Sequence, residues 1–169
     1  MNVAPTIEVP DTKDIFRNAM RRMAASVSIV TAKFEGQKAG ATVSSVTSVS
    51  FDPMSLLVCI HGQSRFHDII SKADRFCINL LKADQAELSN SFSRPASEQD
   101  LFSQGNWQEK NGHPFLMDAQ ANFFLVKKEA FVFGSHTIFI GEVSDVICAD
   151  EVAPLVYMDG GYVTPQKNT

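Results

Sequence analysis

The stretch AGATVSSVTSVSFDP, residues 39–53, combines the features of a strand with those of a binding surface. From position 42 to position 50, six of the nine side chains carry a hydroxyl and the other three are valine. Valine and threonine favour extended backbone, so we predict one continuous strand over residues 42–50. Four serines have little structural reason to occupy such a strand, and they make the stretch a candidate ligand site.

The hydroxyls of this predicted strand fall mainly on one face. Successive side chains of a strand point to opposite faces, so one face carries Thr42, Ser44, Val46, Ser48 and Ser50. A hydroxyl donates one hydrogen bond and accepts two, and a row of hydroxyls suits a flat polar heterocycle or a phosphate. A solvated strand face is the alternative reading. Lysine and glutamate, which are usual on a solvated face, are absent from residues 39–51.

The composition is that of one soluble domain. The chain has 169 residues, of which 44% are apolar and 20% are charged, and its 13 phenylalanines provide material for a core. The formal charge of −4 argues against a nucleic-acid surface, which is normally basic. No apolar run approaches the ~18–20 residues that span a bilayer, and the N-terminus lacks the regions of a signal peptide. We therefore predict a cytoplasmic protein that binds neither nucleic acid nor membrane.

The cysteines and histidines form no metal motif. Cys59, Cys77 and Cys148 are scattered among apolar neighbours, with no CxxC and no Cys/His pair. Such cysteines commonly pack as small hydrophobic side chains, and an odd number without a pattern is typical of a reducing cytoplasm. We predict no metal site.

The remaining patterns predict alternating strands and short helices. Residues 1–11 lack periodicity and are predicted to form a loose arm, followed by a single domain over residues 12–169. Phe16, Met20 and Met23 have helical spacing behind Asp11 or Thr12 as N-cap. Later segments predict a helix over residues 82–93 capped by Asp84, a long and partly helical loop over residues 94–114, and two strands joined by a turn near residues 127–134, with a bulge at Gly141. About six mostly antiparallel strands indicate a barrel or a sandwich.

Six stretches resemble the short-chain flavin reductases, in order and at the family's spacing. They are RRMAASVSIVT (21–31), TVSSVTSVSFDPMSLLVCI (42–60), FCINLLKADQAELSNSFS (76–93), NGHPFLMDAQA (111–121), GSHTIFIGEV (134–143) and PLVYMDGGY (154–162). The resemblance covers about residues 14–163. Ser135 stands where the family usually has an aspartate. Asn79, in the third stretch, is predicted to have a structural role, because a buried amide must be satisfied locally.

The resemblance implies a mainly β, split β-barrel FMN-binding fold, an antiparallel Greek-key barrel with short peripheral α-helices. It implies a homodimer that binds FMN or FAD and reduces the flavin with NADH or NADPH. It also implies a separate monooxygenase that receives the reduced flavin. Hydride passes between the two cofactors, which supply the reactivity themselves. No GxGxxG motif is present, so a Rossmann domain is excluded as the nicotinamide site.

The family's pattern assigns cofactor-binding roles by position. The edge of the flavin ring is expected at Thr42, Val43, Ser44 and Ser45, and the ribityl chain or phosphate at Thr47, Ser48, Val49 and Ser50. Further cofactor contacts are expected at Ser26, Val27, Gln63, Ser64, Arg65, Phe92 and Tyr162. His136 matches the catalytic position near the nicotinamide. The alternatives are a solvated Arg65, a turn histidine at position 136, and core or interface roles for Phe92 and Tyr162.

The prediction is therefore an NAD(P)H:flavin oxidoreductase, the reductase component of a two-component monooxygenase. A non-catalytic flavin carrier on the same barrel is the main alternative. A dimeric scaffold with an exposed hydroxyl strand is a second. An oxidase acting on a vitamin B6 phosphate is a third, although its site would be expected to hold more basic residues. The choice between FMN and FAD, and between NADH and NADPH, stays open.

Overall fold

The computed structural model describes residues 11–165, and the largest unit within them is one antiparallel sheet of seven strands. The strand order is β3-β2-β6-β9-β10-β5-β4. The bounds are β2 (Ser28–Phe34), β3 (Gln37–Val43), β4 (Thr47–Phe51), β5 (Met54–His61), β6 (Arg75–Leu80), β9 (Ala121–Phe133) and β10 (His136–Cys148). The two edge strands, β3 and β4, are consecutive in the chain and are separated only by residues 44–46. The sheet therefore curls until its edges meet, which confirms the predicted mainly β, antiparallel barrel.

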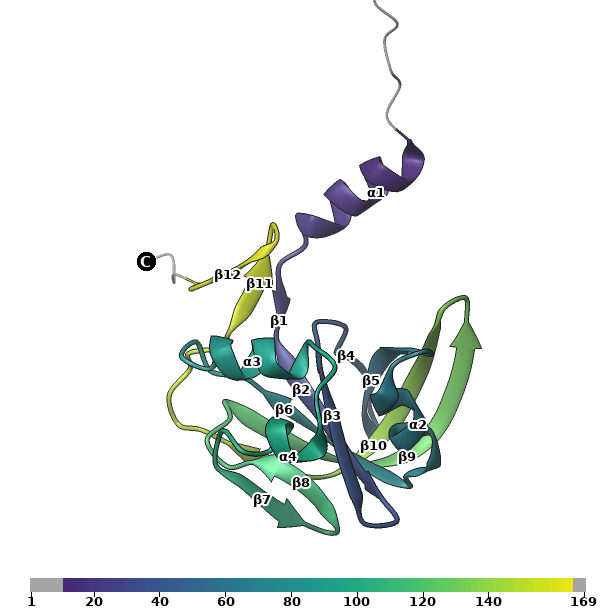
Figure 1. Cartoon of the computed structure of the whole chain (residues 1–169), viewed down its shortest axis with the longest axis vertical. Helices are drawn as coiled ribbons and strands as arrows, with labels where there is room; N and C mark the ends of the chain where they lie inside the picture. The colour runs from purple at the N-terminus through teal and green to yellow at the C-terminus, as the bar shows by residue number, and fades with distance from the viewer. Residues whose placement is uncertain (1–10, 166–169) are drawn as a thin grey trace, which may run out of the picture.

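Two smaller sheets stand beside the barrel (Figure 1). One joins the start and the end of the domain in the order β1-β11-β12, and the other is the hairpin of β7 and β8. The bounds are β1 (Ala25–Ser26), β7 (Trp107–Lys110), β8 (His113–Leu116), β11 (Val156–Met158) and β12 (Gly161–Val163). The predicted final strand and turn are thus a hairpin, which pairs through β11 with the strand that precedes β2.

Four short helices lie at the periphery, as predicted. They are α1 (Thr12–Arg21), α2 (Arg65–Lys72), α3 (Ala86–Phe92) and α4 (Glu98–Leu101). Figure 1 shows α2 on one side of β3, α3 and α4 on the other, and α1 projecting away from the barrel. Asp11 caps α1, as predicted, by accepting a hydrogen bond from the Lys13 N–H. The rest of the predicted arm lies outside the described residues. No helix in the described part of the chain is long and apolar enough to cross a membrane.

Two large groups of buried side chains form most of the core, beside a small third group of Cys77, Phe115 and Phe124. The first fills the barrel under α2 and includes Val30, Ile60, Ile70, Phe76, Leu125 and Phe139. The second lies under α3 and α4 and includes Ile29, Leu81, Leu88, Phe92, Leu101 and Leu116. The second group attaches α3 and α4 to the outer side of β2, and this places both helices beside β3.

Asn79 joins three strands through its buried amide. Its Nδ2 donates to the Ile29 carbonyl at 2.7 Å, and its Oδ1 accepts from the Leu116 N–H at 2.8 Å and from Asn122 Nδ2 at 2.9 Å. The side chain is fully buried. The predicted structural role of Asn79 is confirmed, because each partner satisfies a polar group that would otherwise be costly to bury.

Three local predictions need correction. Residues 42–50 are not one strand, because the chain turns at residues 44–46 to pass from one sheet edge to the other. Gln85, and not Asp84, precedes α3, and no side chain caps this helix. Residues 94–114 are not one loop: they contain α4, β7 and the start of β8.

The hairpin of β9 and β10 is longer than predicted. Its turn lies at Gly134 and Ser135, so both strands continue through most of the segment predicted as a turn. Backbone pairing extends from His136 opposite Phe133 to Cys148 opposite Ala121, and this long ladder stabilises the extension. The predicted bulge is confirmed, since the register shifts between Ile140 and Gly141.

A buried histidine makes the stability of the fold sensitive to acid. His113, on β8, is only 2% exposed and lies against the ring of Phe124, with the two ring centroids 5.6 Å apart. Burial, and then the charge of Arg75, lower the pKa of His113 to about 4. An unfolded histidine has a pKa near ~6.5, so between these values the unfolded chain binds a proton that the folded chain does not.

We therefore predict that protonation of His113 in the unfolded chain lowers the free energy of unfolding by about 3 kcal/mol as the pH is lowered from 7 to 4. Urea unfolding at a series of pH values measures this loss. The His113→Phe variant should lose less stability over the same range, because it has no group to titrate at this position. Equal losses in the two proteins would contradict the prediction.

Candidate active site

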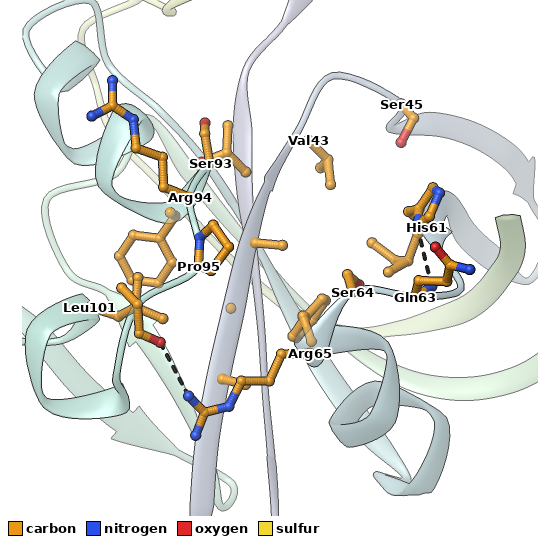
Figure 2. Close-up of a pocket in the computed structure, with 18 of the residues that line it drawn as sticks. Val43, Ser45, His61, Gln63, Ser64, Arg65, Ser93, Arg94, Pro95 and Leu101 are labelled. Carbon is orange, nitrogen blue, oxygen red and sulfur yellow. Dashed lines mark hydrogen bonds between the residues drawn. The ribbon is translucent and has the colours of Figure 1, made fainter. Parts of the chain in front are cut away.

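A cavity of about 540 Å³ lies across the end of β3 (Figure 2). Backbone and small side chains of β3 form its floor. One wall is the turn between β5 and α2, with Gln63, Ser64 and Arg65, and the opposite wall is the segment between α3 and α4, with Ser93, Arg94 and Pro95. The cavity is thus built where the closing edge of the barrel meets the two sets of helices.

Small residues make the floor flat. Ala39, Gly40 and Ala41 line the cavity in succession. A Cβ placed on Gly40 would lie only 2.8 Å from Cε1 of Phe92, so this position has no room for a side chain. Phe92 is 4% exposed, and the rings of Phe102 and Trp107 hold it from behind. A planar ligand can therefore approach the β3 backbone closely.

The end of β3 and the corner after it continue the lining of the cavity. Thr42, Val43, Ser44 and Ser45 all line it. The Thr42 hydroxyl donates to the Ser89 carbonyl at 2.7 Å, and the Ser45 hydroxyl bonds both the carbonyl and the N–H of Cys59. Two of the predicted ligand hydroxyls therefore hold the corner in place. The exposed hydroxyl of Ser44 has no partner among residues 11–165.

The predicted site residues separate into three groups. Nine line the cavity: Thr42, Val43, Ser44, Ser45, Gln63, Ser64, Arg65, Phe92 and His136. Two, Val27 and Tyr162, line a smaller adjoining hollow that also borders Thr42, Val43 and Ser44. Five border neither space: Ser26, Thr47, Ser48, Val49 and Ser50. The last four lie on β4, which turns away from the cavity to pair with β5.

The start of α2 gives one wall polar groups that suit an anion. Ser64 is the N-cap and accepts the His67 N–H at 3.2 Å. The first N–H groups of a helix have no intrahelical acceptor and favour anionic ligands. Arg65 extends across the cavity and donates to the Ala96 carbonyl at 3.2 Å on the opposite wall (Figure 2).

Positive charge exceeds negative charge around the cavity. Lys38, Arg65 and Arg94 line it, with Glu98 as the carboxylate. The Lys38 ammonium binds Glu109 at 3.1 Å, outside the cavity. Hydrogen bonds from Lys33 and Lys38 lower the pKa of Glu109, so this carboxylate stays charged and holds Lys38 in position. The surplus of cations favours a phosphate-bearing ligand.

His136 lies at the rim, opposite His61 on the neighbouring strand β5. The two imidazole rings meet edge to face, with centroids 5.1 Å apart. The Ser135 hydroxyl lies 2.9 Å from His136 Nδ1, so serine supplies a hydrogen-bonding group beside this ring. Nδ1 of His61 accepts the Gln63 N–H at 3.2 Å. Among the described residues, no group of three or more His, Cys, Asp or Glu side chains is placed to hold a metal ion.

Several cavity residues were missed by the sequence prediction. Residues 39–41 have the sequence Ala-Gly-Ala, and three such small residues in a row indicate that a ligand can approach the strand. This pattern is weaker than that of the hydroxyl-bearing residues that follow it. Residues 93–98 fall partly in the predicted long loop, and long loops are often functional. Lys38 has no local pattern that distinguishes it from other surface residues.

The fold and cavity define a class of protein, a small antiparallel barrel with a cavity at its closing edge that suits a flat, phosphate-bearing ligand. The model of the flavin reductase like domain matches residues 20–166. The chain therefore belongs to the flavin reductase family, and its activity is that of an oxidoreductase.

Two curated relatives and one solved structure illustrate the similarity. The reductase component of the FADH(2)-dependent resorcinol hydroxylase of Rhizobium sp. (strain MTP-10005) is 37% identical over 150 residues, 87% of this chain and 84% of the relative. The FMN reductase (NADH) of Pseudomonas syringae pv. syringae (strain B728a) is 33% identical over 148 residues, 87% of this chain and 83% of the relative. A crystal structure of a flavin reductase from Haemophilus somnus 129pt superimposes with a TM-score of 0.88 at 34% sequence identity. The match covers 92% of this chain and 100% of the Haemophilus chain.

We predict that Gly40→Ala weakens flavin binding about tenfold, because the new methyl group displaces Phe92 from the floor and the floor loses its flat shape. Fluorescence titration with FMN and FAD measures the effect. Gly161→Ala is the matched control, since no atom lies within 4 Å of its added Cβ. Equal affinities in both variants would show that the floor is not the ligand surface.

Proposed function

We propose that this chain is an NADH-dependent flavin reductase that supplies reduced flavin to a separate monooxygenase. The cavity carries the proposal: it combines a flat floor at residues 39–41 with a cationic wall at Arg65 and an imidazole at its rim. The Rhizobium relative belongs to a two-component hydroxylase, and the Pseudomonas relative is named for NADH and FMN. Both similarities support this assignment.

The flavin would lie along the end of β3. Its ring would rest on the backbone at residues 39–43, with Phe92 beneath, and its polar edge would meet Ser44 and the backbone of residues 42–45. Its phosphate would bind the guanidinium of Arg65 and the first N–H groups of α2. This placement leaves the predicted contacts on β4 outside the site.

When bound, the flavin supplies the redox chemistry by accepting a hydride from the nicotinamide. The chain orients the two rings and excludes water from between them. We assign His136 to contact the nicotinamide at the open rim, and the Ser135 hydroxyl to hold the imidazole through Nδ1. Residues 93–98 would close the site on the other side, where the Ala96 carbonyl meets Arg65.

The chain would act as a homodimer in the cytoplasm. The helix α1 has no buried residue: Ile15, Phe16 and Met20 stay exposed on it, and so does Met23 just after its end. The tip of the β9–β10 hairpin also exposes apolar residues, and Phe133 is 82% accessible. A second copy of the chain would cover such surfaces. The three free cysteines are compatible with a reducing compartment.

The assignment is tested by the oxidation of NADH and NADPH by the purified protein, with FMN, FAD or no added flavin. We expect turnover that depends on flavin and is faster with NADH. Flavin binding without any turnover would contradict the reductase assignment and would favour a flavin carrier.

We predict that His136→Ala raises the KM for NADH about tenfold and leaves the flavin affinity unchanged, because the imidazole contacts the nicotinamide only. His67→Ala is the control, since His67 bonds Thr137, the neighbour of His136, but does not line the cavity. Unchanged kinetics in His136→Ala would remove this residue from the site.

We predict that Phe16→Glu converts the homodimer to a monomer, because a carboxylate on the apolar face of α1 cannot be buried unpaired. Light scattering after size-exclusion chromatography measures the mass. Asn18→Glu, on the opposite face of the helix, is the matched control. A dimer that survives Phe16→Glu, or a wild-type monomer, would contradict the proposed role of α1.

A further inference from the structure

The two histidines at the rim of the cavity join two turns of the chain. His61 is the last residue of β5, His136 is the first residue of β10, and the two are direct cross-strand partners. Their rings meet edge to face at an interplanar angle of 85°. The Gly62 N–H also donates to the Ser135 carbonyl at 2.9 Å. The turn before α2 and the turn of the β9–β10 hairpin are therefore held together by backbone and by side chains.

His61 also builds the turn that leads into α2. Its Nδ1 accepts the Gln63 N–H at 3.2 Å (Figure 2), and its carbonyl accepts the Ser64 N–H at 3.0 Å. Ser64 is the N-cap of α2, so this turn fixes where the helix begins beside the cavity. The His61 side chain thus stabilises the wall to which the proposed function assigns the flavin phosphate.

The contact with Gln63 defines the orientation of the His61 ring. A backbone N–H can only donate, so Nδ1 carries a lone pair, and in a neutral imidazole the proton then lies on Nε2. Rotation of the ring by half a turn would replace Nδ1 with a C–H group, and the Gln63 N–H would lose its acceptor. The His61 ring therefore has one favoured orientation, from which it supports a neighbouring side chain.

The ring of His136 has weaker support of its own. Backbone pairing in β10 positions its Cα but leaves the side chain free to change rotamer. The Ser135 hydroxyl, 2.9 Å from Nδ1, holds one atom of the ring, and His136 makes no other side-chain hydrogen bond within residues 11–165. Contact with a fixed neighbouring ring restrains the plane as well, since aromatic pairs favour an edge-to-face arrangement. The orientation of His136 therefore depends on His61.

We propose that His61 is a positioning residue with two separable actions. Its ring orients His136 towards the nicotinamide, and its Nδ1 holds the turn that binds the flavin phosphate. The inference rests on the proposed function, which assigns these two ligand groups to the two sides of His61. One side chain thereby couples the placement of the hydride donor to that of the flavin, and the two cofactor rings must be aligned for hydride transfer.

Two substitutions separate these actions. His61→Asn removes the ring but keeps the turn, because an asparagine side chain accepts the backbone N–H two residues on, as Nδ1 of His61 does. His61→Phe keeps the ring contact and removes the acceptor. His67→Asn, the same exchange at a histidine that does not line the cavity, is the matched control.

The structural part is tested by NMR on the full chain without cofactors. Three-bond coupling constants across the Cα–Cβ bond of His136 report whether its χ1 angle is fixed or averaged over rotamers. We expect a single rotamer in the wild type and in His61→Phe, and averaged values in His61→Asn, because only the asparagine variant lacks the supporting ring. The signals of His136 are identified by their loss in His136→Ala.

The functional part is tested by binding and kinetics. In His61→Asn, the KM for NADH at saturating flavin should rise about fivefold, with the affinity for FMN unchanged. In His61→Phe, FMN should bind about fivefold more weakly, whereas riboflavin, which lacks the phosphate, should bind as it does to the wild type. His67→Asn should match the wild type in each of these measurements.

Three results would overturn the inference. These are a single His136 rotamer in His61→Asn, an unchanged KM for NADH in that variant, or the same changes in FMN affinity and in KM for NADH with both substitutions of His61. Failure of the proposed function has a different signature. If the wild type oxidises no NADH, but His136 loses its single rotamer only in His61→Asn, the positioning of His136 by His61 stands and the reductase assignment is lost.

Discussion

The fold depends on the corner at residues 44–46, which joins the two edges of the main sheet. Four Cα–Cα steps cover at most about 15 Å, so β3 and β4 cannot lie at opposite ends of a flat sheet. The Ser45 hydroxyl fixes the closure, since it accepts the N–H of Cys59 and donates to its carbonyl on β5. At this closing edge, the Ser45 side chain makes the two hydrogen bonds to the Cys59 backbone that a neighbouring strand would otherwise make.

The same corner builds the site. The lining of the cavity continues from β3 through Ser44 and Ser45 of the corner, and residues 42–44 also border the smaller adjoining hollow. The helices on the two sides of β3 then provide different chemistry: Arg65 and the start of α2 on one side, and the segment after α3 on the other. Barrel closure and the polar end of the proposed flavin site thus share one local geometry, next to the flat floor at Gly40.

The sequence predicted the fold well because the relevant signals are local. Alternating apolar residues identify most strands, and six family-like stretches identify the barrel and the activity. The candidate site was predicted in part. Thr42 and Ser45 were correctly placed at the cavity, yet the structure uses their hydroxyls for hydrogen bonds to Ser89 and Cys59. Periodicity cannot distinguish a straight strand from two strands that meet at a corner, so the residues of β4, which border neither space, were predicted together with those that line the cavity. Lys38 reaches the site only through long-range packing, which no local pattern contains.

The most direct test of this account is the urea unfolding of Ser45→Ala, with and without saturating FAD, against Ser48→Ala as the control. Ser48 is exposed on β4 and lies outside the cavity. We predict that Ser45→Ala loses about 2 kcal/mol of unfolding free energy and most of the stabilisation by FAD, because both closing hydrogen bonds are removed. Ser48→Ala should retain both. If Ser45→Ala unfolds like the control and is stabilised equally by FAD, the corner does not hold the barrel and the site together.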